Sequence, residues 1–130
     1  MLSAAINELV DGANFAAFTT LREKDGFPTT QIMWVGRDGD HLLINTEIHR
    51  RKFANVQADP RCVVTVWKAG HPYSFAEIRG EVVETIGGQR ARDHIDGLSR
   101  TYRDGRDYDP DAIQSERVIL KIRPVASYVR

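Results

Sequence analysis

The 130-residue sequence predicts a mainly β domain, in which six antiparallel strands form a small closed barrel and a few short helices complete the chain. Three observations support this fold class. Segments rich in β-branched and aromatic residues recur at strand length. Turn signals with glycine or proline separate them. The length suits a single domain with one core. Closing the sheet into a barrel would also leave no exposed strand edge.

The N-terminal part of the chain predicts one helix followed by a three-stranded meander. Ser3 can cap the helix, and Asp11-Gly12 can end it. The three strands that follow are separated by short turns, so neighbouring strands are expected to be antiparallel. Their expected ranges are 15–22, 29–35 and 41–46, with turns at Asp25-Gly26 and at 36–40.

The spacing of apolar residues changes in the second part of the chain. Apolar residues three apart, followed by the stop signal Asp59-Pro60, predict a helix over 50–58. A second amphipathic helix is expected over 91–102, where apolar residues recur at intervals of four and three. The remaining strands are expected at 62–68, 75–86 and 117–123.

Composition and charge restrict the possible functions. The chain has 18 basic and 18 acidic residues, so its net charge does not favour nucleic acid or an anionic membrane as a partner. Cys62 is the single cysteine, and the four histidines lack metal-ligand spacing, so no metal site is predicted. The first residues do not form a secretory signal, and no stretch approaches the about 18 apolar residues of a membrane span. The protein is therefore expected to be cytoplasmic.

The segment that points most directly to chemistry is Arg50-Arg51-Lys52, at the start of a predicted helix. The N-terminal end of a helix carries about half a positive charge, so each cation there costs about 0.3–1 kcal/mol. A bound phosphate would remove this conflict, because it accepts hydrogen bonds from free backbone N–H groups and from basic side chains. The alternative is a solvated basic patch, and the segment alone does not decide between the two.

No serine-histidine-acid set, pair of catalytic carboxylates or glycine-rich phosphate loop can be recognised in the sequence. No catalytic residue is therefore assigned. This pattern is expected of a protein in which a bound cofactor carries the reactive chemistry, while the chain binds and orients it.

Six segments in one order resemble the pyridoxamine 5'-phosphate oxidase-like family of split β-barrels. Within that family, the chain looks most similar to small reductases that use the deazaflavin coenzyme F420. The resemblance implies the split-barrel fold, a homodimer, and a cofactor that lies across the first strands at the dimer interface. The segments, which span nearly the whole chain, are NFAAFTTLREKDGFP, QIMWV, LLINTEIHRRKFANVQADPRCVVTV, HPYSFAEIRGEVVE, HIDGLSRTY and ERVILKIRP.

The resemblance also implies which residues contact the cofactor. The second strand would contribute largely its backbone, and the end of the third strand would lie near the cofactor side chain. Arg51 and Lys52 would bind the phosphate, with Arg50 extending the pair. Tyr73 would border the pocket, as a contribution that could come from the partner subunit. The expected cofactor-binding residues are Gln31, Ile32, Met33, Trp34, Asn45, Thr46, Arg50, Arg51, Lys52, Asn55 and Tyr73.

Three functions are open at this point. The first is an oxidoreductase that transfers a hydride from reduced coenzyme F420 to an activated double bond of an enone, quinone or tetrapyrrole. The second is an FMN-dependent oxidase or flavin reductase, and the third is a non-catalytic protein that binds flavin, F420 or haem. The three cations favour F420, because its tail is longer and more anionic than that of FMN. Oxidation of pyridoxamine phosphate is not expected, since the short chain shows no second basic set.

Overall fold

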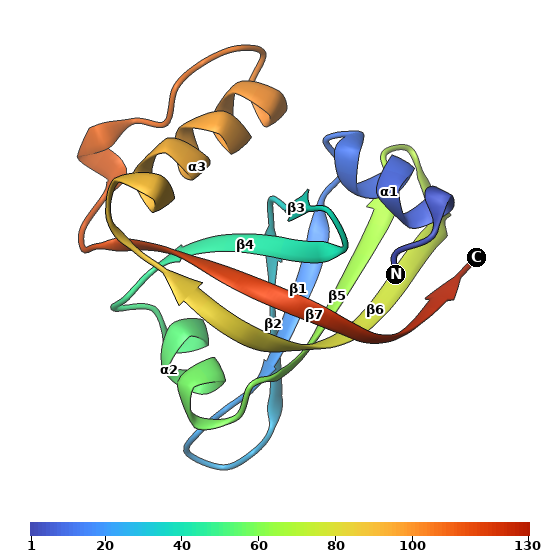
Figure 1. Ribbon diagram of the computed structural model, residues 1–130, viewed down its shortest axis with the longest axis horizontal. Helices are drawn as coiled ribbons and strands as arrows, with labels where there is room; N and C mark the ends of the chain where they lie inside the picture. Colours follow the sequence, from blue (N-terminus) through green and yellow to red (C-terminus); the bar gives the residue numbers. More distant parts are fainter.

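The computed structural model describes residues 1–130 as a curved antiparallel sheet with three α-helices and one 3₁₀ helix (Figure 1). The mainly β class is therefore confirmed. The strands are β1 (Ala16–Leu21), β2 (Pro28–Met33), β3 (Gly36–Asp38), β4 (His41–Glu47), β5 (Arg61–Lys68), β6 (His71–Ile86) and β7 (Arg117–Val129). The helices are α1 (Ala4–Asp11), α2 (Arg51–Ala58) and α3 (Gly88–Tyr102), and the 3₁₀ helix is Pro110–Ala112.

The seven strands form one sheet in the order β2-β1-β5-β6-β7-β4-β3. β6 and β7 are long and curved, so the sheet wraps around until β4 crosses in front of β1 and β5 (Figure 1). Every pairing is antiparallel. The result is a barrel that is split along one side.

The split lies between β2 and β3, which are the two ends of the strand order although only Trp34 and Val35 separate them in sequence. The closed barrel expected from the strand pattern is wrong on this side, whereas the split barrel that the family resemblance implies is confirmed. The physical reason is Tyr102 of α3, whose hydroxyl accepts a hydrogen bond from Val35 N–H at 3.1 Å and donates one to Asn14 O at 2.7 Å. A side chain thus satisfies the backbone groups at this corner, where a closed barrel would use a neighbouring strand.

The structure has seven strands where the sequence predicts six. The additional strand, β3, falls in the stretch 36–40, whose glycines predict a turn. β3 pairs with β4 so that Asp38 opposes His41 across the two residues between them. Gly39 has φ of +58° there, as a two-residue hairpin turn requires. The turn is therefore shorter than predicted.

β6 and β7 are also longer than predicted. β6 begins at His71, because Gly70 has φ of +79° and permits a tight turn before it. β7 continues through Pro124 to Val129. Proline has no N–H to donate to a sheet, and the register between β6 and β7 shifts where Pro124 opposes Gly80. The irregular pairing lets the strand pass the proline without ending.

The core lies inside the curve of the sheet, and the alternation of side chains decides which residues enter it. Along β1 and β5, every second residue is buried. The largest fully buried side chains include Phe18, Ile44, Ile78, Leu120 and Ile122. Their alternate neighbours on the same strands point away from the core, to the outer face of the sheet.

The helices lie at the ends and on one side of the barrel (Figure 1). Ser3 Oγ accepts a hydrogen bond from Ile6 N–H at 3.3 Å, which confirms the predicted cap of α1. The helices predicted at 50–58 and 91–102 are confirmed as α2 and α3. α3 packs against β4 and β7. None of these helices is long and apolar enough to cross a membrane.

Candidate functional site

Two cavities meet at the N-terminal end of α2. The first, with a volume of about 270 Å³, is lined by β2, β4, α3, the start of β7 and Tyr108, and we call it the aromatic cavity. The second, with a volume of about 710 Å³, lies between the β1–β2 connection and α2, and we call it the basic cavity. Arg50 and Lys52 line both cavities and form a common wall. A ligand long enough to extend past this wall would contact both.

Aromatic rings give the first cavity a rigid apolar side. Trp34, in the corner between β2 and β3, stacks on Tyr102 with ring centroids 5.3 Å apart and 17° between the planes. Tyr108 stands edge-on to Trp34 at 6.2 Å, with 90° between the planes. Met33 and Leu98 add apolar surface. Fixed rings and apolar side chains of this kind suit a flat, largely apolar ligand.

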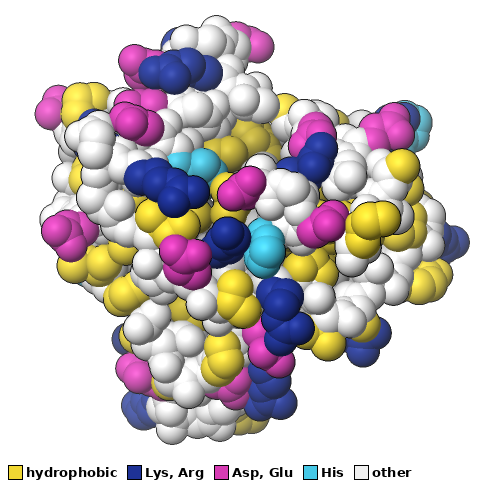
Figure 2. All heavy atoms as spheres, viewed as in Figure 1, with side chains coloured by type: hydrophobic (Ala, Val, Ile, Leu, Met, Phe, Trp, Pro, Cys, Tyr) yellow, Lys and Arg dark blue, Asp and Glu magenta, His cyan; other side chains and the backbone are white.

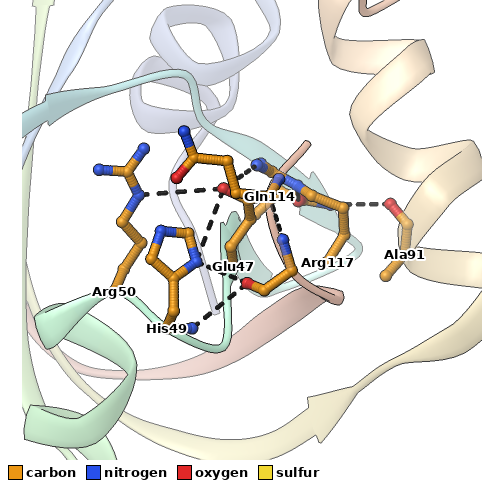
Figure 3. Close-up of polar contacts among 8 residues, drawn as sticks. Glu47, His49, Arg50, Ala91, Gln114 and Arg117 are labelled. Carbon is orange, nitrogen blue, oxygen red and sulfur yellow. Dashed lines mark hydrogen bonds and ion pairs between the residues drawn. The ribbon is translucent and has the colours of Figure 1, made fainter. Parts of the chain in front are cut away.

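Another part of the wall of the aromatic cavity is polar, and it is held by the pairing of β4 with β7 (Figure 3). Arg117, the first residue of β7, is 8% exposed and lies opposite Glu47, the last residue of β4. Its Nε donates to Asn45 Oδ1 at 2.8 Å, and its Nη1 lies 3.8 Å from Glu47 Oε2. Its guanidinium is 5.2 Å from the ring centre of Tyr108. The arginine is thus fixed on three sides.

Glu47 is the buried carboxylate behind this wall, with 1% of its side chain exposed. Its Oε1 accepts hydrogen bonds from the backbone N–H groups of Gln114 at 2.6 Å and Ser115 at 3.1 Å. Burial by itself would raise the pKa of Glu47. The hydrogen bonds from Ser115 and Gln114 and the charges of Arg117 and His49 outweigh burial and hold this pKa below its ordinary value. Glu47 therefore stays ionised.

The amide of Asn45 connects Arg117 to α3. Its Nδ2 donates to Ala91 O at 2.9 Å and lies 3.0 Å from His94 Nδ1. Because Arg117 can only donate and Ala91 O can only accept, the orientation of the amide is fixed, and His94 Nδ1 must act as an acceptor. Burial, with the charges of Arg117 and Arg90, lowers the pKa of His94, so the imidazole is neutral.

Positive charge is in excess on the wall of the aromatic cavity. Arg50, Lys52 and Arg117 line it, and no carboxylate does. Burial lowers the pKa of Lys52, and the charges of Arg50 and Arg117 lower it further. Acidic and basic side chains are interspersed over the molecular face in Figure 2, so this excess is local. An anionic group in the cavity would relieve the repulsion.

The basic cavity surrounds the first turn of α2. Five Lys and Arg side chains line it, together with His49 and a single carboxylate, that of Glu23. Arg50 is the N-cap of the helix; no side chain caps it, and the first turn contains no acidic residue. The backbone N–H groups of Arg51 and Lys52 therefore have no backbone acceptor, whereas that of Phe53 donates to Arg50 O at 3.1 Å. Together with the cations, the two free N–H groups can bind a phosphate.

Ten of the eleven residues predicted to bind a cofactor line these cavities. Tyr73 does not: it lies at the start of β6, is 77% exposed, and has its ring 5.7 Å from the guanidinium of Arg130. Its contact with a cofactor remains a prediction that would need the partner subunit. The aromatic cavity contains Ile32, Met33, Trp34, Asn45, Thr46, Arg50 and Lys52, and the basic cavity contains Gln31, Arg50, Arg51, Lys52 and Asn55.

Asn55 has a structural task within the chain. Its Nδ2 donates to Thr20 Oγ1 at 3.0 Å, and its Oδ1 accepts a hydrogen bond from Glu23 N–H at 3.2 Å. The buried amide thus ties α2 to the end of β1 and shapes the edge of the basic cavity. Sequence reasoning did not single out Arg117, Glu47 or Tyr108. An arginine at the start of an apolar strand usually faces solvent, so the sequence carries no signal that Arg117 is buried.

Comparisons with known proteins agree with this fold. The family model described as pyridoxamine 5'-phosphate oxidase matches residues 2–128. A search of curated proteins finds no significant match. A solved structure named "F420 Reductase" is 28% identical, with 94% of each chain covered and a TM-score of 0.77.

Two further solved structures share the fold at lower identity. General Stress Protein 26 from Bacillus anthracis is 19% identical over 95% of this chain and 89% of that chain, with a TM-score of 0.69. An FMN-binding protein from Nostoc punctiforme, related to pyridoxamine 5'-phosphate oxidase, is 14% identical over 98% and 84%, with a TM-score of 0.65. Since the family model spans nearly the whole sequence, the chain belongs to the pyridoxamine 5'-phosphate oxidase family.

Proposed function

We propose that the protein is an oxidoreductase that binds coenzyme F420 across the two cavities. The observation that carries the proposal is the wall shared by both cavities, formed by Arg50 and Lys52. An apolar cavity with aromatic sides adjoins a cationic cavity at a helix N-terminus. This arrangement suits a molecule with a flat ring system at one end and a phosphate-bearing tail at the other.

Different residues of the two cavities would bind different parts of the cofactor. Arg51, Lys52 and the free N–H groups of α2 would hold the phosphate, while Trp34 and Tyr108 would flank the ring. Met33, Leu98 and the neighbouring apolar side chains would keep water from the ring. When bound, the cofactor supplies hydride transfer, and the acceptor we propose is an activated double bond of an enone, quinone or tetrapyrrole.

The charge of the basic cavity favours F420 over FMN. FMN offers one phosphate, whereas F420 adds the carboxylates of its glutamate tail. Five cations with one carboxylate exceed what a single phosphate needs. The name of the solved structure with 28% identity also supports F420. An FMN-dependent oxidase or flavin reductase is the second candidate, favoured by the FMN-binding relative with the same fold.

A paired titration tests the choice of cofactor. Purified apo protein is titrated with F420 and with FMN while the cofactor fluorescence is followed, and riboflavin, which has the ring but no phosphate, serves as the control. We expect saturable binding of F420 at lower concentration than FMN, and weak binding of riboflavin. Tighter binding of FMN would move the protein to the flavin branch, and binding of neither would support a non-catalytic protein with another ligand.

We also infer that the protein is a homodimer, from the outer face of the sheet. One cross-strand row on this face runs from β2 to β7 through Ile32, Ala17, Thr65, Glu77 and Tyr128. Ile32 and Tyr128 are 60% and 54% exposed, and Ala17, Thr65 and Glu77 lie between them. Exposed apolar surface of this kind marks interaction sites, and a flat sheet face can pair with a second copy by two-fold symmetry. Ile32 also lines the aromatic cavity, so the partner would border it.

Light scattering coupled to size-exclusion chromatography checks the dimer. We expect the mass of a dimer at micromolar concentration, and a monomer for Thr65→Arg, which places a long side chain in the middle of the face. Gln89→Arg, an exposed change on α3, is the matched control and should leave the dimer intact. A wild-type monomer at micromolar concentration would contradict the inference.

A further inference from the structure

The guanidinium of Arg117 is the charged group in the aromatic cavity that the phosphate site does not use. It is buried, and its side-chain hydrogen bond runs from Nε to Asn45 Oδ1. Nη1 lies 3.8 Å from Glu47 Oε2, beyond hydrogen-bond length. The one fully buried polar side-chain atom without a hydrogen-bond partner is Asn7 Oδ1. The Nη atoms of Arg117 are not among such atoms, so they are not fully buried. Because Arg117 lines the aromatic cavity, we infer that its remaining donors open into that cavity.

The position of this guanidinium is set in advance of any ligand. Asn45 cannot turn away from Arg117, because its Nδ2 is committed to Ala91 O and His94 Nδ1. Glu47 and Tyr108 hold the other sides of the guanidinium. A planar group of donors fixed in this way is suited to a planar anion, and little side-chain entropy is lost when the anion binds.

Arg117 differs from Arg50 and Lys52 in the cavities that it contacts. Arg50 and Lys52 border both cavities, whereas Arg117 lines the aromatic cavity alone. Burial lowers the pKa of Arg117, although Tyr108 and Glu47 act in the opposite direction. Glu47 is also close to Arg50 and His49, with 3.9 Å to each. One carboxylate therefore serves two arginines, Arg50 and Arg117, and positive charge is left for a ligand in the aromatic cavity.

We propose that Arg117 binds the negatively charged ring of the ligand in the aromatic cavity, so that the site selects a ring that is ionised. This inference rests on the proposed function. The deazaflavin ring of F420 carries an acidic phenolic hydroxyl, whose negative charge is delocalised across the ring when it ionises. The oxidised ring of FMN is neutral. Arg117 thus favours F420 at the ring end, independently of the cations that bind the tail.

The experiment is a pH titration of the absorbance of F420, free and bound to a saturating amount of wild-type protein. A positive charge stabilises the ionised ring, so binding should lower the pKa of the ring hydroxyl by about one to three units. Arg117→Gln, which can still donate to Asn45, should reduce this shift measurably, and Arg50 and Lys52 would account for what remains. A bound ring that titrates at the same pH as free F420 would overturn the proposal without any variant.

Two control variants separate the ring from the tail. Arg51→Gln, in the basic cavity, should weaken F420 binding and leave the titration of the bound ring unchanged. Arg123→Gln, which removes an exposed arginine of the same strand that pairs with Glu81 at 3.2 Å, should change neither. Arg117→Gln behaving like wild type would overturn the role of Arg117. Circular dichroism checks its folding, and Arg117→Lys, which keeps the charge, should retain most of the shift.

The two proposals fail in different ways. If wild-type protein does not bind F420 at all, the proposed function is wrong. If it binds F420 but the ring hydroxyl titrates as in free solution, the proposed function stands and the inference about Arg117 is wrong.

Discussion

Replacing Arg51 and Lys52 together with alanine is expected to weaken binding of F420 by about 3–6 kcal/mol, at about 1.5–3 kcal/mol for each hydrogen bond to a charged group. This corresponds to about two to four orders of magnitude in Kd. Both residues lie in the first turn of α2 and line the basic cavity, where the helix has no side-chain cap and no acidic residue. A fluorescence titration of the double variant measures the loss directly.

The control for this prediction removes two cations outside both cavities. Arg61 and Arg100 are exposed and pair with Asp59 and Asp107 at 2.7 Å and 2.6 Å. Their joint replacement by alanine should leave the affinity for F420 unchanged. If the Arg51 and Lys52 variant also binds F420 with unchanged affinity, the segment is a solvated basic patch, which was the alternative open from the sequence.

The largest expected effect on stability is that of Glu47→Ala, which should lower the free energy of unfolding by about 3–5 kcal/mol. The substitution leaves Arg117 buried without its counter-charge. It also removes the acceptor of the backbone N–H groups of Gln114 and Ser115. Urea unfolding followed by tryptophan fluorescence gives the difference. Glu81→Ala, which breaks an exposed pair with Arg123, is the control and should cost less than about 1 kcal/mol.

The same carboxylate makes a prediction about pH. The pKa of Glu47 is lower in the folded protein than in the unfolded chain. Its contribution to stability is therefore complete above the ordinary glutamate pKa, and is lost as the pH falls through the lower pKa of the folded state. Wild-type protein should lose more stability below about pH 4.3 than Glu47→Ala does. Parallel losses in the two proteins would show that Glu47 is not the group responsible.

Local features of the fold were predictable from the sequence, because they depend on neighbouring residues. The cap at Ser3, the start of α2 after Arg50 and the alternation along the strands all follow from local pattern. The charges Glu47 and Arg117 did not reveal their role, since each stands at the end of an apolar strand, where solvent is the usual neighbour. They meet only because β4 pairs with β7. Alternation determines the face of a residue, but it does not determine its partner strand.

The split of the barrel follows from the family resemblance but could not be predicted from the strand pattern alone, for a related reason. The sequence indicates strands on both sides of Trp34 and Val35, and closure is the simplest way to protect their edges. At this corner, the hydroxyl of Tyr102 accepts the hydrogen bond of Val35 N–H, and Tyr102 belongs to α3, far along the chain. Asn55 shows the same limit: helical spacing places it near the basic cavity, but its amide is already bonded to Thr20 and Glu23.

The wall shared by the two cavities has a consequence for how a long ligand is retained. Once one end is bound, the other end is held at a high effective concentration beside its own cavity, so its release is followed by rapid rebinding. Complete dissociation requires both ends to be free at once. A fragment with only the ring or only the tail lacks this advantage. If a ligand binds across both cavities as proposed, Arg50 and Lys52 would make the pair of cavities a chelating site, in which residence time depends on the intact length of the ligand.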